Sequence, residues 1–493
     1  MHDNKGQIKA KSIKSNYIYN VLYEVFALLA PLITTPYVSR VLGAEGVGLY
    51  GFTYSLAQYF VILGNLGVAT YGQMAVASVR DDRKAVSKLF WELFILRGTT
   101  TILSMMVYVA VSMSSPTYRT ARLILAVLIF ASVFDLSWFF RGIEDFSKVV
   151  IRNFVIKIAT IALIFALVKT KEDVYVYISL IAISTLLGNL TFIIPIRKIL
   201  TKVSVREFQF RHHLKECMVF FLPTIATSVY TLLDKSMLGW LTGGTLENGY
   251  YEQSHKIEQI LITVIISLNT IMRSRMSYLY SHGFMNEMKR RMNRSLSFIM
   301  MIAIPMAAGL SGIASNFIPL FLGPGYEKSI PLLQIFSLLF ICIGLSNCLN
   351  THFLGPAGRQ GKNNYVLVAG ACVNAICNYI SIPKFGAIGA AVSSVLAEAL
   401  ILCGYLYLSR DFVKVRDLLK LGWKYAISGC LMLVAVKCVG NIDVDTIISL
   451  IIQVAVGVIT YLMLLLVLND SFLRKDAIEM VKSILSRGNR NVK

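Results

Sequence analysis

Basic side chains lie inside several long apolar stretches of this sequence, where little water is available to solvate a charge. The candidates are Arg97, Arg152, Lys157, Lys235, Lys256, Lys424 and Lys437. A basic residue at the centre of a membrane-spanning helix costs about 2.5–3.5 kcal/mol on insertion scales, so its presence needs a reason. One reason is a bound anion, since guanidinium and ammonium groups suit phosphate oxygens. The other is an ion pair with a carboxylate.

Carboxylates occur in the same apolar stretches, so ion pairing is an alternative to anion binding. They are Glu24, Glu92, Asp135, Asp234, Glu252, Glu258 and Glu398. Glu252 and Lys256 are four residues apart, which is the spacing of an ion pair along one helix face. Glu24 lies on a polar stripe near a proline, and Asp135 lies deep in its apolar segment. A carboxylate in such a place can carry a proton, so Glu24 and Asp135 are the predicted coupling residues of a transporter.

Amide side chains form a third polar group within the apolar stretches: Asn20, Gln58, Asn65, Asn374 and Asn378. Amides can bind the hydroxyl groups of a sugar, and they can equally join two helices by hydrogen bonds. Both interpretations are open at the level of the sequence.

Residue patterns of a catalytic or metal site do not occur. The six histidines lie in the tails, in predicted loops or near the ends of predicted spans. The eight cysteines fall within predicted spans and include no C-x-x-C pair. Neither a Gly-rich nucleotide loop nor a metal-ligand spacing is found. We therefore predict a protein that is not an enzyme and that needs no cofactor and no metal ion.

The composition indicates which elements must position these polar groups. Of the 493 residues, 56% are hydrophobic and 15% are charged, and the mean hydropathy is +0.64. An ordinary soluble chain is about 45–50% apolar and about 25% charged. The sequence therefore predicts an all-α polytopic membrane protein. The net charge of +21 lies mostly in loops, which argues against a nucleic-acid partner.

Apolar stretches of spanning length predict about fourteen transmembrane helices. Outside them, 34 Lys and Arg residues lie in the tails and even-numbered connections, and 6 lie in the odd-numbered connections. Positive residues are enriched in cytoplasmic loops, so both termini are predicted to be cytoplasmic.

The predicted organisation is two pseudo-symmetric six-helix bundles followed by two additional helices. The segments are a cytoplasmic tail (1–16), an N-terminal bundle (17–195), a basic cytoplasmic linker (196–215), a C-terminal bundle (216–409), two additional transmembrane helices (410–468) and a basic cytoplasmic tail (469–493). Internal repeats are a common feature of transporters.

A short motif occurs once in each predicted bundle. Gly48–Tyr50 is followed by Gln58, and Gly249–Tyr251 is followed by Gln259, at the same offset. The first copy belongs to a helical hairpin that carries polar residues at helical spacing. Polar residues on a spanning helix normally face other helices or a water-filled cavity. We therefore expect this hairpin to form one wall of a path through the membrane.

Longer motifs add a family resemblance that runs nearly from end to end. They are Pro36–Tyr50, Leu66–Gly67, Asp234–Lys235, Gly249–Tyr251 with Lys256, Arg275–Ser277, Gly355–Arg359, and Gly386–Ala391 followed by Glu398. On these residues the chain resembles the Wzx-type oligosaccharide flippases of bacterial polysaccharide biosynthesis, within the multidrug/oligosaccharidyl-lipid/polysaccharide exporter superfamily. Met74–Ala75 and Ser274 depart from the pattern, since the family often has Arg-Glu and Pro there.

The resemblance implies a V-shaped pair of six-helix bundles and a defined transport activity. An undecaprenyl-pyrophosphate-linked oligosaccharide would move from the inner to the outer leaflet of the bacterial plasma membrane. The implied partners are this lipid-linked substrate, membrane lipids and other polysaccharide assembly proteins. The predicted pyrophosphate contacts are Arg97, Lys157, Lys235, Lys256 and Arg152, and the five amides are the predicted sugar contacts.

Two alternatives from other functional classes remain. One is a cation-coupled exporter of small molecules or drugs from the same superfamily, and the other is a membrane enzyme of the same pathway, such as a polysaccharide polymerase. The two additional helices and the interior cations argue against the exporter. The connections, none longer than roughly two dozen residues, argue against the enzyme.

Overall fold

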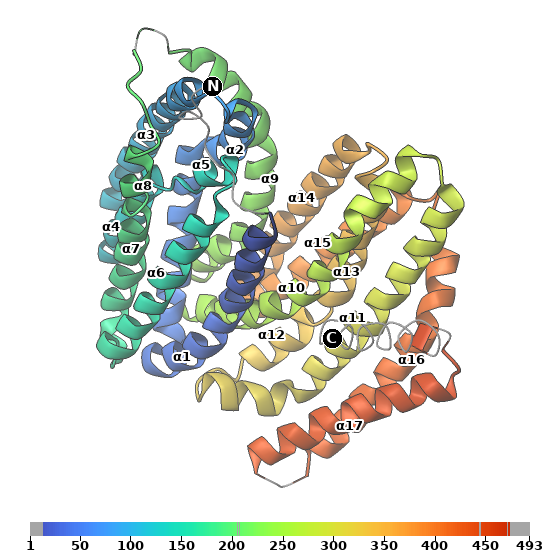
Figure 1. Ribbon diagram of the computed structural model, residues 1–493. Helices are drawn as coiled ribbons and strands as arrows, with labels where there is room; N and C mark the ends of the chain where they lie inside the picture. Colours follow the sequence, from blue (N-terminus) through green and yellow to red (C-terminus); the bar gives the residue numbers. More distant parts are fainter. Residues whose placement is uncertain (1–12, 205, 207, 443–444, 471, 474–493) are drawn as a thin grey trace, which may run out of the picture. The chain divides into compact units, whose positions relative to one another are not determined.

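The computed structural model describes residues 13–204, 206, 208–442, 445–470 and 472–473. Side chains are described from residue 25 onward, apart from Gln360 and several positions in the helices that span 210–281. The described residues form helices joined by short connections and contain no strand (Figure 1). The all-α membrane fold predicted from the composition is therefore confirmed.

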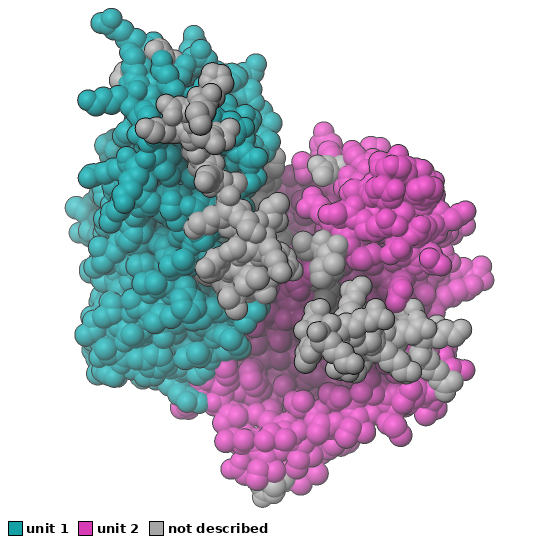
Figure 2. All heavy atoms as spheres, in the orientation of Figure 1, with its two compact units in different colours: residues 1–252 teal, residues 253–493 magenta. Residues whose placement is uncertain are grey.

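Two compact units divide the chain, residues 1–252 and residues 253–493 (Figure 2). The first unit contains α1 (Ile13–Asn65), α2 (Val68–Val79), α3 (Arg83–Ser114), α4 (Arg119–Val133), α5 (Ser137–Gly142), α6 (Phe146–Leu167), the short η1 (Lys171–Asp173), α7 (Val174–Leu190), α8 (Ile193–Arg197) and α9 (Phe210–Thr242). The helix α10 (Leu246–Ser281) begins in the first unit and continues into the second.

The second unit contains the remaining helices. They are α11 (Met285–Leu322), α12 (Ser329–Phe336), α13 (Leu339–Leu349), η3 (Asn350–Leu354), α14 (Gln360–Phe385), α15 (Ala387–Leu408), α16 (Val415–Gly440) and α17 (Thr446–Val467). The last two correspond to the two additional helices expected from the sequence, and both pack against α11. A buried polar contact fixes this packing, because Asn316 of α11 donates a hydrogen bond to Gln453 of α17 over 3.1 Å.

Eleven helices of the described chain are long and apolar enough to cross a membrane, or up to twelve if one bent pair is counted as a single span. The first of these segments runs over 55 residues and is broken at Gly43, where φ is +67°. That length suffices for two crossings, since about 20 helical residues span the hydrocarbon core. The count of fourteen spans remains a prediction.

Helix α9 packs against α1, α2 and α3 in the first unit. The domain borders predicted around the linker 196–215 also remain a prediction.

Two apolar clusters hold the first unit together. One joins α1, α3, α4 and α7 around Leu125, Ile129 and Ile178, and the other surrounds Trp138 and Phe139 of α5. These clusters fix the helices that carry the polar side chains described below.

Candidate functional site

A cavity of about 300 Å³ opens in the first unit between α1, α6 and α7. Its volume is at the lower end of the roughly 300–1,000 Å³ that ligand pockets occupy. The residues that line it are Ala30, Pro31, Thr34, Arg152, Asn153, Ile156, Lys157, Thr160, Ile161, Ile164, Tyr177, Ile181, Ser184 and Thr185. Two of the predicted phosphate contacts, Arg152 and Lys157, are therefore brought together in one cavity.

Lys157 is one of the two cations that line this cavity. Its side chain is half-buried, and its ammonium group lies 3.4 Å from the backbone carbonyl oxygen of Ala27 on α1. No ion pair joins Lys157 to a carboxylate of the described residues. A half-buried ammonium group with one neutral acceptor retains donors for an anion.

Arg152 is held in place from the side of α7. Its guanidinium donates a hydrogen bond to the Asn189 side-chain oxygen over 2.6 Å and stacks 4.5 Å from the ring of Phe192. Asn189 in turn donates to the backbone carbonyl of Ala131 over 2.7 Å. Arg152 therefore has a fixed orientation at the wall of the cavity. Sequence reasoning missed Asn189, because only the contact between α4, α6 and α7 gives it this position.

Arg97 lies outside the residues that line the cavity. Its side chain is 2% exposed, and one guanidinium nitrogen donates to the backbone carbonyl of Asp135 over 2.6 Å. A second nitrogen lies 3.9 Å from the Asp135 carboxylate. The pair joins α3 to the end of α4, which is the ion-pairing alternative that the sequence left open. Contact of Arg97 with a substrate stays a prediction, as does the coupling role of Asp135.

The two copies of the repeated glycine motif meet where α1 crosses the start of α10. A Cβ atom on Gly48 would lie 1.7 Å from the carbonyl oxygen of Thr245, and one on Gly249 would lie 1.8 Å from that of Ala44. Side chains cannot fit at such distances, so the two backbones touch directly. The sequence indicated the repeat but not that its two copies contact each other.

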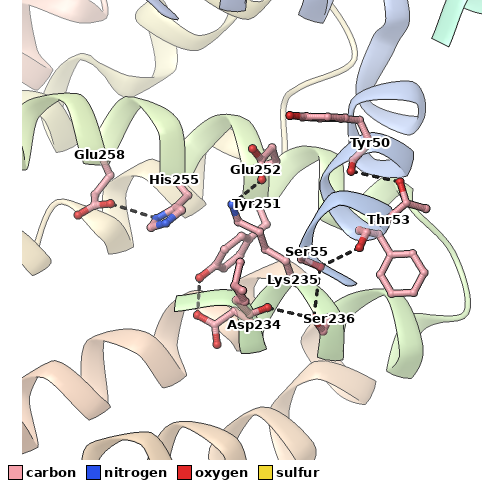
Figure 3. A network of polar contacts seen from close by, with 12 residues as sticks. Tyr50, Thr53, Ser55, Asp234, Lys235, Ser236, Tyr251, Glu252, His255 and Glu258 are labelled. Carbon is pink, nitrogen blue, oxygen red and sulfur yellow. Dashed lines mark hydrogen bonds and ion pairs between the residues drawn. The ribbon is translucent and has the colours of Figure 1, made fainter. Parts of the chain in front are cut away.

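A polar network surrounds this crossing (Figure 3). The Lys235 ammonium lies 2.7 Å from the Glu252 carboxylate, and the Tyr251 hydroxyl donates to Asp234. The hydroxyls of Ser55 on α1 and Ser236 on α9 are 3.2 Å apart. Lys235 is thus paired with a carboxylate. Lys256 lies in the second unit, where it is half-buried.

The predicted sugar contacts are spread over both units. Gln58 and Asn65 are half-buried on α1, and Asn378 donates to Asn374 over 3.1 Å on α14, where both are fully buried. The side chains of Asn20 and of the predicted coupling residue Glu24 lie outside the described residues.

A buried contact in the basic linker was also missed by sequence reasoning. His213, which was expected in a cytoplasmic loop, is 7% exposed at the start of α9. Its ring lies 3.0 Å from the Glu92 carboxylate on α3 and 2.9 Å from the Tyr71 hydroxyl on α2. The backbone amide of Gln209 donates to the same carboxylate over 2.7 Å. These contacts explain why Glu92 can be buried, whereas the sequence indicated no partner for this carboxylate.

The fold and the cavity together define a many-helix membrane protein with cations in its interior. Residues 13–276 match the model of the polysaccharide biosynthesis protein family (Polysacc_synt), and the chain belongs to this family. Among curated relatives, a putative O-antigen transporter of Escherichia coli strain K12 is 24% identical over 397 residues, which cover 79% of this chain and 95% of that protein.

Solved structures show the same fold at low sequence identity. The lipid II flippase MurJ, in an inward closed conformation, matches with a TM-score of 0.67 at 15% identity, over 94% of this chain and 100% of that one. A MATE transporter in a bent conformation matches with a TM-score of 0.51 at 17% identity, over 83% of this chain and 95% of that one. These likenesses concern the fold, and the resemblance to a family of polysaccharide biosynthesis stated from the sequence is confirmed by the family match over residues 13–276.

Proposed function

We propose that this protein is a flippase for lipid-linked oligosaccharides. Its substrate would be an undecaprenyl-pyrophosphate-linked repeat unit, which it would move from the cytoplasmic to the outer leaflet of a bacterial plasma membrane for surface polysaccharide synthesis. Family membership and the relatives named as O-antigen transporters support this class of activity. The structural observation that carries the proposal is Lys157, a half-buried cation without a described carboxylate partner in a cavity between helices.

The chemistry of the substrate explains why such a cation is needed. Moving a pyrophosphate and a sugar chain through hydrocarbon would strip water from two charged groups and many hydroxyls, at a cost that bare lipid cannot offset. Lys157 and Arg152 would supply charge-assisted hydrogen bonds to the phosphate oxygens. Thr34, Ser184 and Thr185 line the same cavity and offer hydroxyl groups. The polyprenyl tail can remain in the bilayer throughout.

Two other predicted phosphate contacts, Lys235 and Arg97, have different surroundings from Lys157. Lys235 and Arg97 are each paired with a carboxylate, so either would have to exchange that partner for a phosphate group. Asp135 and Glu24 remain the proposed coupling acids. Lys157 needs no such exchange with a carboxylate of the described residues, since its contact is the backbone carbonyl of Ala27. We therefore place the primary phosphate contact at the cavity.

The test is a binding titration with undecaprenyl pyrophosphate on the full-length protein in detergent. Loss of one hydrogen bond to a charged group costs about 1.5–3 kcal/mol, so Lys157→Ala should weaken binding by about tenfold or more. Lys157→Arg should keep part of the affinity, because the charge is retained. Lys84→Ala removes an exposed lysine of the same unit and is the matched control.

Uncharged undecaprenol provides the second control, because its affinity should not respond to Lys157→Ala. A Lys157→Ala protein that melts like the wild type and binds undecaprenyl pyrophosphate equally well would remove the cavity from the phosphate site. Accumulation of lipid-linked sugar in the inner leaflet of a Lys157→Ala strain would show that transport, as well as binding, depends on Lys157.

A further inference from the structure

A second cavity, of about 400 Å³, lies elsewhere in the first unit, between α3, the turn that joins α4 to α5, and the segment around α8. It shares no residue and no helix with the cavity around Lys157. The proposed flippase activity does not use it. Its lining has two chemically different parts, an aromatic wall and a basic rim.

The aromatic wall is built mainly from α3. The rings of Phe90 and Phe94 stack 5.5 Å apart at 14°, and Trp91 meets Phe94 edge-on at 5.9 Å. Phe134 extends the wall from the end of α4, with its ring 6.4 Å from that of Phe94. The Trp91 side chain is 37% exposed. Aromatic residues with an exposed edge are enriched where a membrane protein meets the lipid headgroups.

The basic rim consists of Arg197 and Lys202, and both side chains are exposed. None of the residues that line the cavity is acidic. Glu92 follows Trp91 on α3, but its carboxylate accepts hydrogen bonds from the Gln209 amide and lies against His213. The cavity therefore has a net positive rim beside an apolar interior.

The segment that carries the rim is fixed to α3 by hydrogen bonds. The Arg83 guanidinium donates to the backbone carbonyls of Ile199 and Lys198, each over 2.7 Å. The backbone amide of Thr201 donates to the Ser87 hydroxyl over 2.9 Å. These bonds hold the backbone between Arg197 and Lys202 against α3. A binding site that is already formed does not lose affinity to the ordering of its own loop.

We propose that this cavity is a binding site for one anionic phospholipid, with the phosphate headgroup between Arg197 and Lys202 and an acyl chain along the aromatic wall. Charge complementarity carries the assignment, because a cationic rim beside an apolar wall matches a lipid that is anionic at one end. The linker that carries the rim belongs to the strongly basic connections of the sequence, which are expected on the side of anionic headgroups. This lipid would remain bound and would not be transported.

Trp91 provides a direct readout, because bromine atoms on a bound acyl chain quench tryptophan fluorescence on contact. The full-length protein is placed in phosphatidylcholine bilayers with increasing fractions of dibrominated phosphatidylglycerol or dibrominated phosphatidylcholine. The signal of Trp91 is the difference between the wild type and Trp91→Phe. We expect half-maximal quenching at a clearly lower fraction of the phosphatidylglycerol.

The double variant Arg197→Gln/Lys202→Gln should raise the fraction of brominated phosphatidylglycerol needed by about tenfold, since each basic group near a membrane surface attracts an anionic lipid. Lys198→Gln/Arg206→Gln is the matched control, because it removes the same charge from the same segment outside the cavity. Its quenching curve should stay near that of the wild type.

Three outcomes would overturn the proposal. Equal quenching by the two brominated lipids would mean that bulk lipid fills the cavity. An equal loss of quenching by brominated phosphatidylglycerol in both double variants would mean that the net charge of the segment, and not this cavity, attracts the lipid. Displacement of brominated phosphatidylglycerol by small amounts of undecaprenyl pyrophosphate would assign the cavity to the transported lipid. The first two results have no bearing on whether Lys157 binds pyrophosphate, and after the third the Lys157→Ala titration still answers that question, so failure of one proposal can be told from failure of the other.

Discussion

At the scale of single residues, the cations of the first unit differ in their partners among the described residues. Arg97 and Lys235 each lie beside a carboxylate, whereas Lys157 has a backbone carbonyl as its described partner. All three appear equivalent in the sequence, as basic residues in apolar stretches. What distinguishes them is the neighbouring helix, which depends on packing between segments far apart in the chain.

We expect Arg97→Ala to act mainly on stability. The buried guanidinium holds the carbonyl and the carboxylate of Asp135, so its removal leaves both groups with fewer partners. Because the two residues share one interaction, the losses in Arg97→Ala and Asp135→Ala should overlap in the double variant by about 0.5–3 kcal/mol. Thermal melting of the four proteins measures this coupling. Additive losses, or lost binding of undecaprenyl pyrophosphate without a change in melting, would instead place Arg97 at the substrate.

At the scale of helices, the crossing of α1 with the start of α10 depends on two glycines. Gly48→Ala and Gly249→Ala should each destabilise the protein by at least the roughly 1–3 kcal/mol typical of overpacking, because each new Cβ would collide with backbone. Gly244→Ala is the control, since nothing lies within 4 Å of a Cβ there. The melting temperature should fall in the first two variants and not in the third. Identical melting of all three would show that the helices do not touch at these glycines.

The sequence was sufficient to predict most helices, because each consists of an apolar stretch of spanning length between polar or basic connections. It also included Arg152 and Lys157 among the candidate phosphate contacts, but it did not indicate that the two share one cavity. It could not predict Asn189 as the partner of Arg152, or His213 as the partner of Glu92. Those contacts join elements separated by 37 and 121 positions, and local periodicity carries no information on them. The break at Gly43, where φ is +67°, falls between two expected spans, within the Gly-rich stretch of the sequence.

At the scale of the whole molecule, the charge distribution predicts which side of the membrane each connection faces. The excess of Lys and Arg lies in the tails and even-numbered connections, which predicts a cytoplasmic location for them. The prediction can be tested with single cysteines in a variant whose eight native cysteines are replaced. Gly244→Cys and Glu327→Cys lie in odd-numbered connections, and Ser204→Cys and His282→Cys lie in even-numbered ones.

An impermeant thiol reagent added to intact cells should label Gly244→Cys and Glu327→Cys and should spare Ser204→Cys and His282→Cys. After the membrane is permeabilised, all four should react. The described structure favours these positions, because Glu327, Ser204 and His282 are exposed and a side chain at Gly244 meets open space. Because an error of one span inverts every later connection, labelling of Glu327→Cys and His282→Cys from the same side would rule out the fourteen-span topology. Labelling of Ser204→Cys in intact cells would separate the basic linker from the cytoplasmic leaflet, where the proposed phospholipid site requires it to be.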